Sequence, residues 1–293
     1  MIRLDAATVL LQWATGGLLF LWVTTRRREV GIGYGWLLRA VYAVLAVGAA
    51  AVGGMLDPVP VRDAASVGAA LAAGVALAVS VVRRKAGVAG ERARRDRKAA
   101  RVAAMAGTKG EDGPAAATVS SAASTDGGVR EFPPALDLIA PVLGVVGLVA
   151  AGMAAGGPDA LAVARTLAGA LFLGAVSDAM LLGHWYLVQP GLGRGPLLEL
   201  NRWLALTWPL EVGLLLWPTG MLSVLAGTVD DGWDGTLGWF WVACAVTTLV
   251  LTGVTQAALR ERAYSAVMAA TGLLYLAILT AFGTDLVARA VLA

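Results

Sequence analysis

The most regular feature of this sequence is a series of long apolar runs separated by short polar connections. A helix needs about 20 apolar residues to cross the roughly 30 Å hydrocarbon core of a bilayer, because it rises about 1.5 Å per residue. The runs are continuous and do not alternate, so they predict helices and not barrel strands. We expect an all-α integral membrane protein, a polytopic bundle of eight transmembrane helices at residues 6–24, 36–55, 64–82, 135–155, 161–188, 197–226, 237–258 and 263–282.

Basic residues gather in every second connection. The connections after the first, third, fifth and seventh spans are basic, whereas LDPVPVRD, AGGPDA and TVDDGWDG on the other side are poor in Lys and Arg. Cytoplasmic loops are enriched in Lys and Arg. The pattern therefore predicts that both termini are extracytoplasmic, and that the cytoplasmic side carries Arg26, Arg27, Arg28, Arg83, Arg84, Lys85, Arg194, Arg260 and Arg262.

A polar insert divides the chain into residues 1–82 with three spans, 83–134, and 135–293 with five spans. Nine basic residues and two acidic ones lie between residues 83 and 101, which indicates a helix that continues into the cytoplasm. The Gly, Ser, Thr, Ala and Pro content of residues 107–134 predicts disorder. The insert has a topogenic role in the simplest interpretation. The alternative is attraction to anionic lipids through Arg26, Arg27, Arg28, Arg83, Arg84 and Lys85. We expect no nucleic-acid binding, because no aromatic residues are interleaved with the basic run.

Composition agrees with a membrane protein and narrows the chemistry. Hydrophobic residues make up 58% of the chain and charged residues 15%, against about half and a quarter in soluble proteins. One cysteine, Cys244, and one histidine, His184, leave no ligand set for zinc, an iron–sulfur centre or a bis-histidine haem. We therefore expect no metal and no covalently bound cofactor. The Ala, Gly, Val and Arg bias, with three lysines, favours the cytoplasmic membrane of a bacterium.

Polar residues converge at the cytoplasmic ends of the fifth and sixth spans. Asp178 lies about 16 Å from the inner end of its helix, and the side chain of Arg202 reaches a similar height on the next helix. His184 and Glu199 match in depth closer to the cytoplasm. These depths predict an inner-leaflet cluster of Asp178, His184, Glu199, Asn201 and Arg202. Trp185 would add an aromatic side chain if the cluster binds a quinone. Helical phase places His184 about 120° from Asp178, so whether the two share one pocket stays open.

Glu211 is the second acidic residue that we predict near mid-membrane depth. An ionisable side chain there must be protonated, paired or exposed to a water-filled cavity. Candidate neighbours of similar depth are Gln12, Thr207, Gln256 and the threonines 248, 252 and 255. Pro209 and Pro218 bracket Glu211 and predict a kinked helix.

Other charged residues are expected to play no part in a site. Arg39 and Arg165 lie about one turn from a predicted helix end, from which their side chains can reach the headgroups. Asp285 falls near the outer end of the last span. The acids of VDDGWDG have the spacing of a divalent-cation site, but solvated loop acids are the simpler interpretation.

Three functional classes fit these features. We expect a non-catalytic or accessory membrane subunit, or scaffold, of a larger complex, with a quinone or proton-exchange site between the fifth and sixth spans; its partners would be other membrane or respiratory subunits. The alternative is a proton-coupled small-molecule transporter that uses Asp178 and Glu211. A membrane enzyme is the third class, and in that case we expect a quinone-linked redox subunit without its own haem or iron–sulfur centre.

Overall fold

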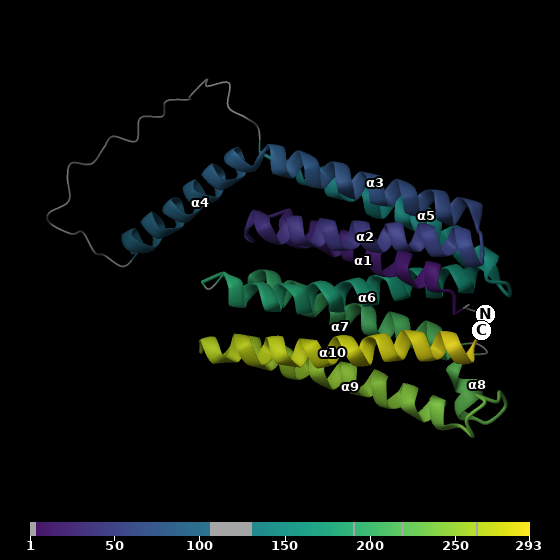
Figure 1. Ribbon diagram of the computed structural model, residues 1–293. Coiled ribbons are helices and arrows are strands. Elements are labelled where there is room, and N and C mark those ends of the chain that lie inside the picture. The colour runs from purple at the N-terminus through teal and green to yellow at the C-terminus, as the bar shows by residue number, and fades with distance from the viewer. Residues whose placement is uncertain (1–3, 106–130, 190, 218–219, 262) are drawn as a thin grey trace, which may run out of the picture. The chain divides into compact units, whose positions relative to one another are not determined.

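The computed structural model describes residues 4–105, 131–189, 191–217, 220–261 and 263–293, without the side chains of residues 98 and 101–105. Every regular element within these ranges is a helix (Figure 1). The elements are α1 (Ala6–Thr25), α2 (Ile32–Leu56), α3 (Pro60–Val82), α4 (Arg84–Met105), the 3-10 helix η1 (Pro134–Leu138), α5 (Ile139–Ala154), α6 (Asp159–Val188), α7 (Gly195–Leu216), α8 (Met221–Leu225), α9 (Thr236–Arg260) and α10 (Tyr264–Val291).

Seven helical segments in the described ranges are long and apolar enough to cross a membrane: α1, α2, α3, η1 with α5, α6, α9 and α10. The sixth predicted span corresponds to α7, which is 22 residues long. It is not among the seven by composition, because it carries Glu199, Arg202 and Glu211. The helices are thus compatible with a multi-pass membrane protein, with seven spans identified by length and composition.

Three predicted elements differ from the observed ones. The sixth predicted span, 197–226, is two helices, because α7 ends at Leu216 and α8 starts at Met221. The last helix runs to Val291 instead of residue 282. The basic run after the third span is a separate helix, α4. The predictions for residues 107–130, Pro218 and Arg262 lie outside the described residues.

Contacts divide the chain into two units, Met1–Leu77 with Pro134–Ala293, and Ala78–Pro133. The first unit is a helical bundle in which α1 contacts α2, α5 and α6, while α10 contacts α6 and α9. Both chain ends, the α2–α3 connection, the α5–α6 connection and α8 lie at one end, which we call the terminal end (Figure 1). The α1–α2, α6–α7 and α9–α10 connections lie at the other, which we call the basic end.

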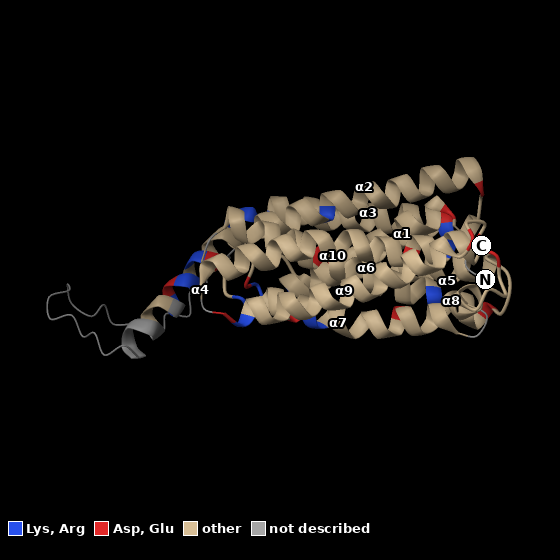
Figure 2. Ribbon diagram, turned by 90° about the horizontal axis from the view of Figure 1, so that it is seen from below, with Lys and Arg blue, Asp and Glu red and all other residues tan. Residues whose placement is uncertain are grey.

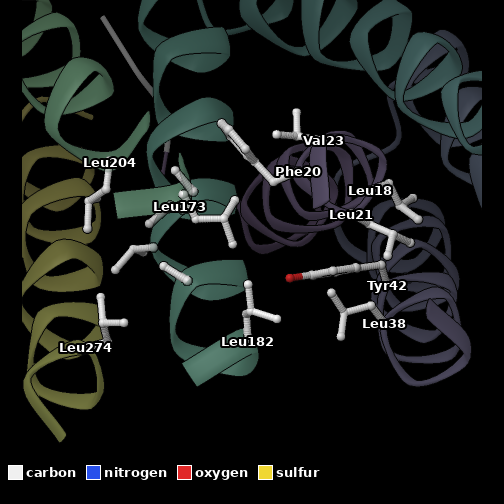
Figure 3. Close-up of a cluster of buried hydrophobic side chains, with 14 of the residues drawn as sticks. Leu18, Phe20, Leu21, Val23, Leu38, Tyr42, Leu173, Leu182, Leu204 and Leu274 are labelled. Carbon is white, nitrogen blue, oxygen red and sulfur yellow. The ribbon is translucent and has the colours of Figure 1, made fainter. Parts of the chain in front are cut away.

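The interior of the first unit is packed with apolar side chains from α1, α2, α6, α7 and α10 (Figure 3). Large apolar side chains also cover the outside of the bundle: Val44 is 70% exposed, Leu71 65% and Leu279 69%. Soluble monomers rarely expose apolar patches beyond a few hundred Å². Charged residues are sparse along the bundle (Figure 2). This surface suits a hydrocarbon environment.

Helices α1 and α6 approach each other closely midway along the bundle. A Cβ atom at Gly16 would lie 1.8 Å from the carbonyl oxygen of Ala170, and one at Gly174 would lie 2.2 Å from the carbonyl carbon of Gly16. Glycine is required at both positions, because any side chain would push the helices apart. This contact lies between Asp178 and the buried polar residues beside Gly169, Gln12 and Asp285.

Candidate functional site

Asp178 lies in the interior and is completely buried. The hydroxyl of Tyr42, from α2, donates a hydrogen bond to Oδ1 of Asp178, and the Tyr34 hydroxyl donates to its backbone oxygen at 3.4 Å. Figure 3 shows the ring of Tyr42 extending from α2 into the apolar interior. Oδ2 of Asp178 has no partner among the described residues. Asp178 is therefore tied to α2 rather than to α7.

His184 lies on the exposed surface of α6. Its Nδ1 is 3.0 Å from the hydroxyl of Tyr275 on α10, and the two rings meet edge to face. The neighbouring Trp185 donates to Gln189 and packs against the ring of Tyr34. The structure thus places His184 at an exposed α6–α10 pair, whereas Trp185 lies on the α2 side of the helix.

The remaining residues of the predicted inner cluster contact three different parts of the protein. Glu199 forms ion pairs with Arg26 at 2.5 Å and Arg27 at 3.3 Å, which join the end of α1 to α7. Asn201 donates to the carbonyl of Thr252 and to the side chain of Gln256 on α9. Arg202 is exposed, because it lies about 100° around the helix from the buried Asn201. The predicted cluster placed these residues at the same height along the bundle. Their side chains point in different directions around the helix axes, so they do not meet.

The basic residues assigned to lipid headgroups lie in both units. Arg28 is exposed and adopts a positive φ of 55° at the end of α1. In the second unit, Arg83 donates to the carbonyl of Glu131 at 3.2 Å. Arg84 and Lys85 are exposed. Arg26 is partly buried beside Glu199, whereas Arg27, Arg28, Arg84 and Lys85 are exposed.

The most concentrated buried polar group surrounds Glu211, where α1, α6, α7 and α10 meet. Glu211 and Asp285 are completely buried. The carboxyl of Glu211 lies close enough to interact electrostatically with the carboxyl of Asp285 and with Arg289 and Arg165. Neither oxygen of Glu211 has a hydrogen-bond donor in the described part of the chain, and Oδ1 of Asp285 lacks one as well. Two buried carboxyl groups, those of Glu211 and Asp285, therefore lie near each other in the interior; we call them the carboxyl pair.

Two arginines lie near the carboxyl pair, and they form hydrogen bonds with different groups. Arg289 is 1% exposed, and its Nε donates to Oδ2 of Asp285 at 2.7 Å, one turn along α10. Arg165 donates instead to the carbonyl oxygens of Leu214 at 2.9 Å and Trp217 at 2.8 Å. It thereby satisfies backbone oxygens that the end of α7 leaves without intrahelical partners. The only direct guanidinium bond to the pair in these contacts comes from Arg289.

Gly169 provides the space in which this group assembles. A Cβ atom there would lie 2.6 Å from Nε2 of Gln12 and 2.7 Å from Oδ1 of Asp285. Gln12 is completely buried and donates to the carbonyl of Thr166 at 2.6 Å. The prediction that Gln12 lies at the depth of Glu211 agrees with this placement.

Two expectations are wrong: that Arg39 and Arg165 reach the headgroups, and that Asp285 lies near the end of its helix. These residues are 3%, 2% and 0% exposed. Arg39 forms a two-bond ion pair with Asp137 of η1, at 2.7 and 2.6 Å. Asp285 was placed near a helix end because the last span was predicted to stop at residue 282. Asp285 and Arg289, four residues apart on one helix face, were a signal that the helix continues.

Other sequence features have local structural explanations. Thr248 and Thr252 donate to carbonyls one turn earlier on α9, as expected for membrane threonines. Asp231 of the VDDGWDG connection accepts hydrogen bonds from the backbone of Trp233, Gly235 and Gly238. Slight desolvation raises the pKa of Asp231, but these donors outweigh it and the pKa lies below its ordinary value. No group of three or more metal-ligating side chains occurs in the described ranges.

No protein-family model, curated protein or solved structure matches the chain.

Proposed function

We propose that the chain spans the cytoplasmic membrane of a bacterium with eight helices and with both termini outside the cytoplasm. Helix α7 contacts α1, α6 and α9, which supports counting it as the eighth span. The exposed Arg28 and Arg260 lie at the basic end, whereas Asp57, Asp159, Asp230, Asp231 and Asp234 lie at the terminal end. The positive-inside rule then assigns the basic end to the cytoplasm.

We infer that the carboxyl pair, Glu211 with Asp285, holds one exchangeable proton. A charged side chain at membrane depth costs roughly 2.5–3.5 kcal/mol even on insertion scales, and two adjacent carboxylates repel each other as well. A proton on one carboxyl removes one charge and forms an O–H···O bond to the other. The observation that carries this proposal is that Glu211 is fully buried near Asp285, while neither of its carboxyl oxygens has a donor among the residues that the structure describes.

The function that these features favour is proton-coupled transport of a small molecule. Asp178 provides a second buried carboxyl closer to the basic end, and its Oδ2 has no hydrogen-bond partner in the described part of the chain. The tight Gly16–Gly174 contact lies between the two carboxyl sites. A carrier that exposes its interior alternately to each side couples transport to protons through buried ionisable groups that bind a proton from one side and release it to the other. The protein would then be a transporter rather than an enzyme or a scaffold.

The experiment that tests this proposal measures proton binding without requiring the transported substrate. Purified protein in liposomes on a solid-supported membrane is exposed to rapid pH jumps. Proton binding inside the membrane displaces charge and gives a transient current. We expect a protein-dependent current that falls at least tenfold in Glu211→Gln, because the amide retains the shape of the side chain but cannot take up a proton.

Infrared difference spectra across the same pH step identify the group that titrates. A protonated-carboxyl band that is sensitive to D₂O is expected in the wild type and absent in Glu211→Gln. Glu199→Gln is the matched control, since Glu199 is also on α7 but is paired with Arg26 and Arg27. A wild-type protein with neither current nor band would refute proton coupling and leave the scaffold as the better proposal.

The exposed His184–Tyr275 pair favours a second candidate, a quinone-binding membrane subunit. Imidazole and phenol groups can exchange hydrogen bonds with quinone oxygens, and both groups of this pair are exposed. Quenching of tryptophan fluorescence by a short-chain quinone, abolished in His184→Ala and retained in Asn201→Ala, would support this candidate. Equal quenching in both variants would count against it.

We also propose anionic phospholipids as partners of the basic surfaces. Arg28 in the bundle and Arg84, Lys85, Arg95 and Arg97 in the Ala78–Pro133 unit are exposed. Each basic residue near an anionic surface contributes about 1 kcal/mol of attraction. If the protein is a scaffold or a quinone-binding subunit, we propose that it also binds other membrane subunits.

A further inference from the structure

A small, partly open pocket lies at the terminal end of the bundle, between α1, the α2–α3 connection, α5, α6 and α10. Its lining includes Asp5, Asp57, Arg62, Thr166 and Arg289. The pocket has room for about one water molecule, and its polar atoms provide the two to four partners that such a water needs. With all four ionised side chains counted, the lining has no net formal charge, because Asp5 and Asp57 balance Arg62 and Arg289.

Two lining residues connect the pocket to the carboxyl pair. The carbonyl of Thr166 accepts a hydrogen bond from Gln12 at 2.6 Å, and Nε2 of Gln12 and Oδ1 of Asp285 converge on the space above Gly169. Arg289 donates to the other oxygen of Asp285 at 2.7 Å. The inner wall of the pocket is therefore built from the residues that position the carboxyl pair.

The opposite wall is held by the side chain of Arg62, which is 1% exposed. Its guanidinium forms ion pairs with Asp5 and, at 2.9 Å, with Asp63, and it donates to the carbonyl of Asp57 at 2.6 Å. Asp5 is also the N-cap of α1, where it accepts the backbone N–H groups of Ala7 and Thr8. Arg62 thus joins α1 to the α2–α3 connection directly beside the pocket.

Resting on the proposed function, we propose that this pocket is the extracytoplasmic proton entrance to the carboxyl pair, and that the Arg62 ion pairs restrict it. A water in the pocket gives a proton to the carboxyl of Asp285 or takes one from it, and Asp285 exchanges that proton with Glu211; Arg289 and Gln12 stay in their ordinary protonation states and only position the carboxyl. Separation of Arg62 from Asp5 widens the passage to the outside. The occupant is water or hydronium, because the space admits nothing larger.

Silver ions are a suitable probe for two reasons. They react with thiols, and they are small enough to enter a space that holds one water molecule. In a Cys244→Ser background, Thr166→Cys introduces a thiol in the pocket wall. The matched control is Thr271→Cys on α10. Both threonines are buried, and both hydroxyls donate to a carbonyl one turn earlier on their own helix. Silver ions are added outside intact cells, and the remaining free thiols are counted with a permeant maleimide after denaturation.

We expect the thiol of Thr166→Cys to react with silver at least ten times faster than that of Thr271→Cys. Reaction at position 166 should also suppress the transient current of the proposed proton site. Adding Arg62→Gln should accelerate the reaction at position 166 further; if that variant does not fold, Asp63→Asn loosens the same guanidinium through one ion pair.

Equal reaction rates at positions 166 and 271 would refute the proposal that the pocket is a proton entrance. If the current is present and depends on Glu211 but position 166 is no more reactive than the control, the entrance is wrong and the proton site stands. If position 166 is reactive but no current exists, the proton site is wrong, and the pocket is a water-accessible cavity without the proposed role.

Discussion

At the residue level, one hydroxyl group holds the Asp178 carboxyl in the bundle interior. Tyr42→Phe removes this donor and leaves the carboxyl without a side-chain hydrogen bond in the described contacts. A buried group that loses its partner costs about 1–3 kcal/mol. We expect the free energy of unfolding in detergent to fall by about that amount.

Tyr275→Phe is the matched control for that experiment, since it removes a hydroxyl that bonds to His184 on the exposed surface. Substitutions of this kind usually change stability by less than about 0.5 kcal/mol. Equal losses in the two variants would show that the Tyr42–Asp178 bond has no special weight.

The sequence does not predict the partners of the membrane acids. Residue number and helical rise place Asp178 and Glu211 at membrane depth, and the structure shows that both are buried inside the protein. Asp285, which lies close to Glu211, was expected near a helix end. Facing residues depend on the rotation of each helix about its axis and on where the chain stops being helical, and neither follows from hydropathy.

At the level of elements, the contact between α1 and α6 fixes the spacing of two helices that carry polar groups of the site. Gly16→Ala would place a methyl group 1.8 Å from the Ala170 carbonyl oxygen, so the helices must separate. Overpacking of this kind typically costs 1–3 kcal/mol. Thermal unfolding monitored by helicity should show the loss, together with a smaller pH-jump current.

Gly54→Ala, on α2, serves as the control because nothing lies within 4 Å of the added methyl group. Its stability should equal or slightly exceed that of the wild type, as alanine is the better helix former. If Gly16→Ala were as stable as Gly54→Ala, the close contact between α1 and α6 would not be needed to hold the two helices at their observed spacing.

The connection before α9 is an element whose order should depend on pH. The pKa of Asp231 is below its ordinary value in the folded protein, so its stabilising effect is complete above about pH 4 and lost as the pH falls further. Hydrogen exchange of residues 227–238, corrected for the intrinsic rate, should therefore increase at acid pH. In Asp231→Ala we expect fast exchange at every pH; persistence of the acid step in that variant would contradict the assignment.

Element boundaries show where sequence patterns fail. The apolar run of the sixth predicted span continues from α7 into α8, so hydropathy alone did not locate the end of α7 at Leu216. Conversely, the last helix extends past Asp285 and Arg289 because their charges satisfy each other inside the protein. The all-helical architecture itself was predictable, since an apolar environment requires backbone groups to bond within each segment.

At the level of the whole molecule, the proposed orientation can be tested with fusions. Alkaline phosphatase fused after residue 293 should be active, whereas a fluorescent protein at the same position should remain dark. The control is the same pair of reporters inserted between residues 106 and 130, where the outcome should reverse. The opposite result at both positions would invert the orientation and place the entrance pocket on the cytoplasmic side.

The early end of α7 has an electrical consequence. Glu211 lies five residues before Leu216, about 7.5 Å along the helix, or roughly a quarter of the hydrocarbon thickness. A charge crossing the full membrane potential changes energy by about 2.3 kcal/mol per 100 mV. In the proposed orientation, and with 100 mV across the membrane, a proton that moves from outside to Glu211 changes energy by about 0.6 kcal/mol, and one that moves from Glu211 to the cytoplasm by about 1.7 kcal/mol. Voltage would thus act mainly on the inward step.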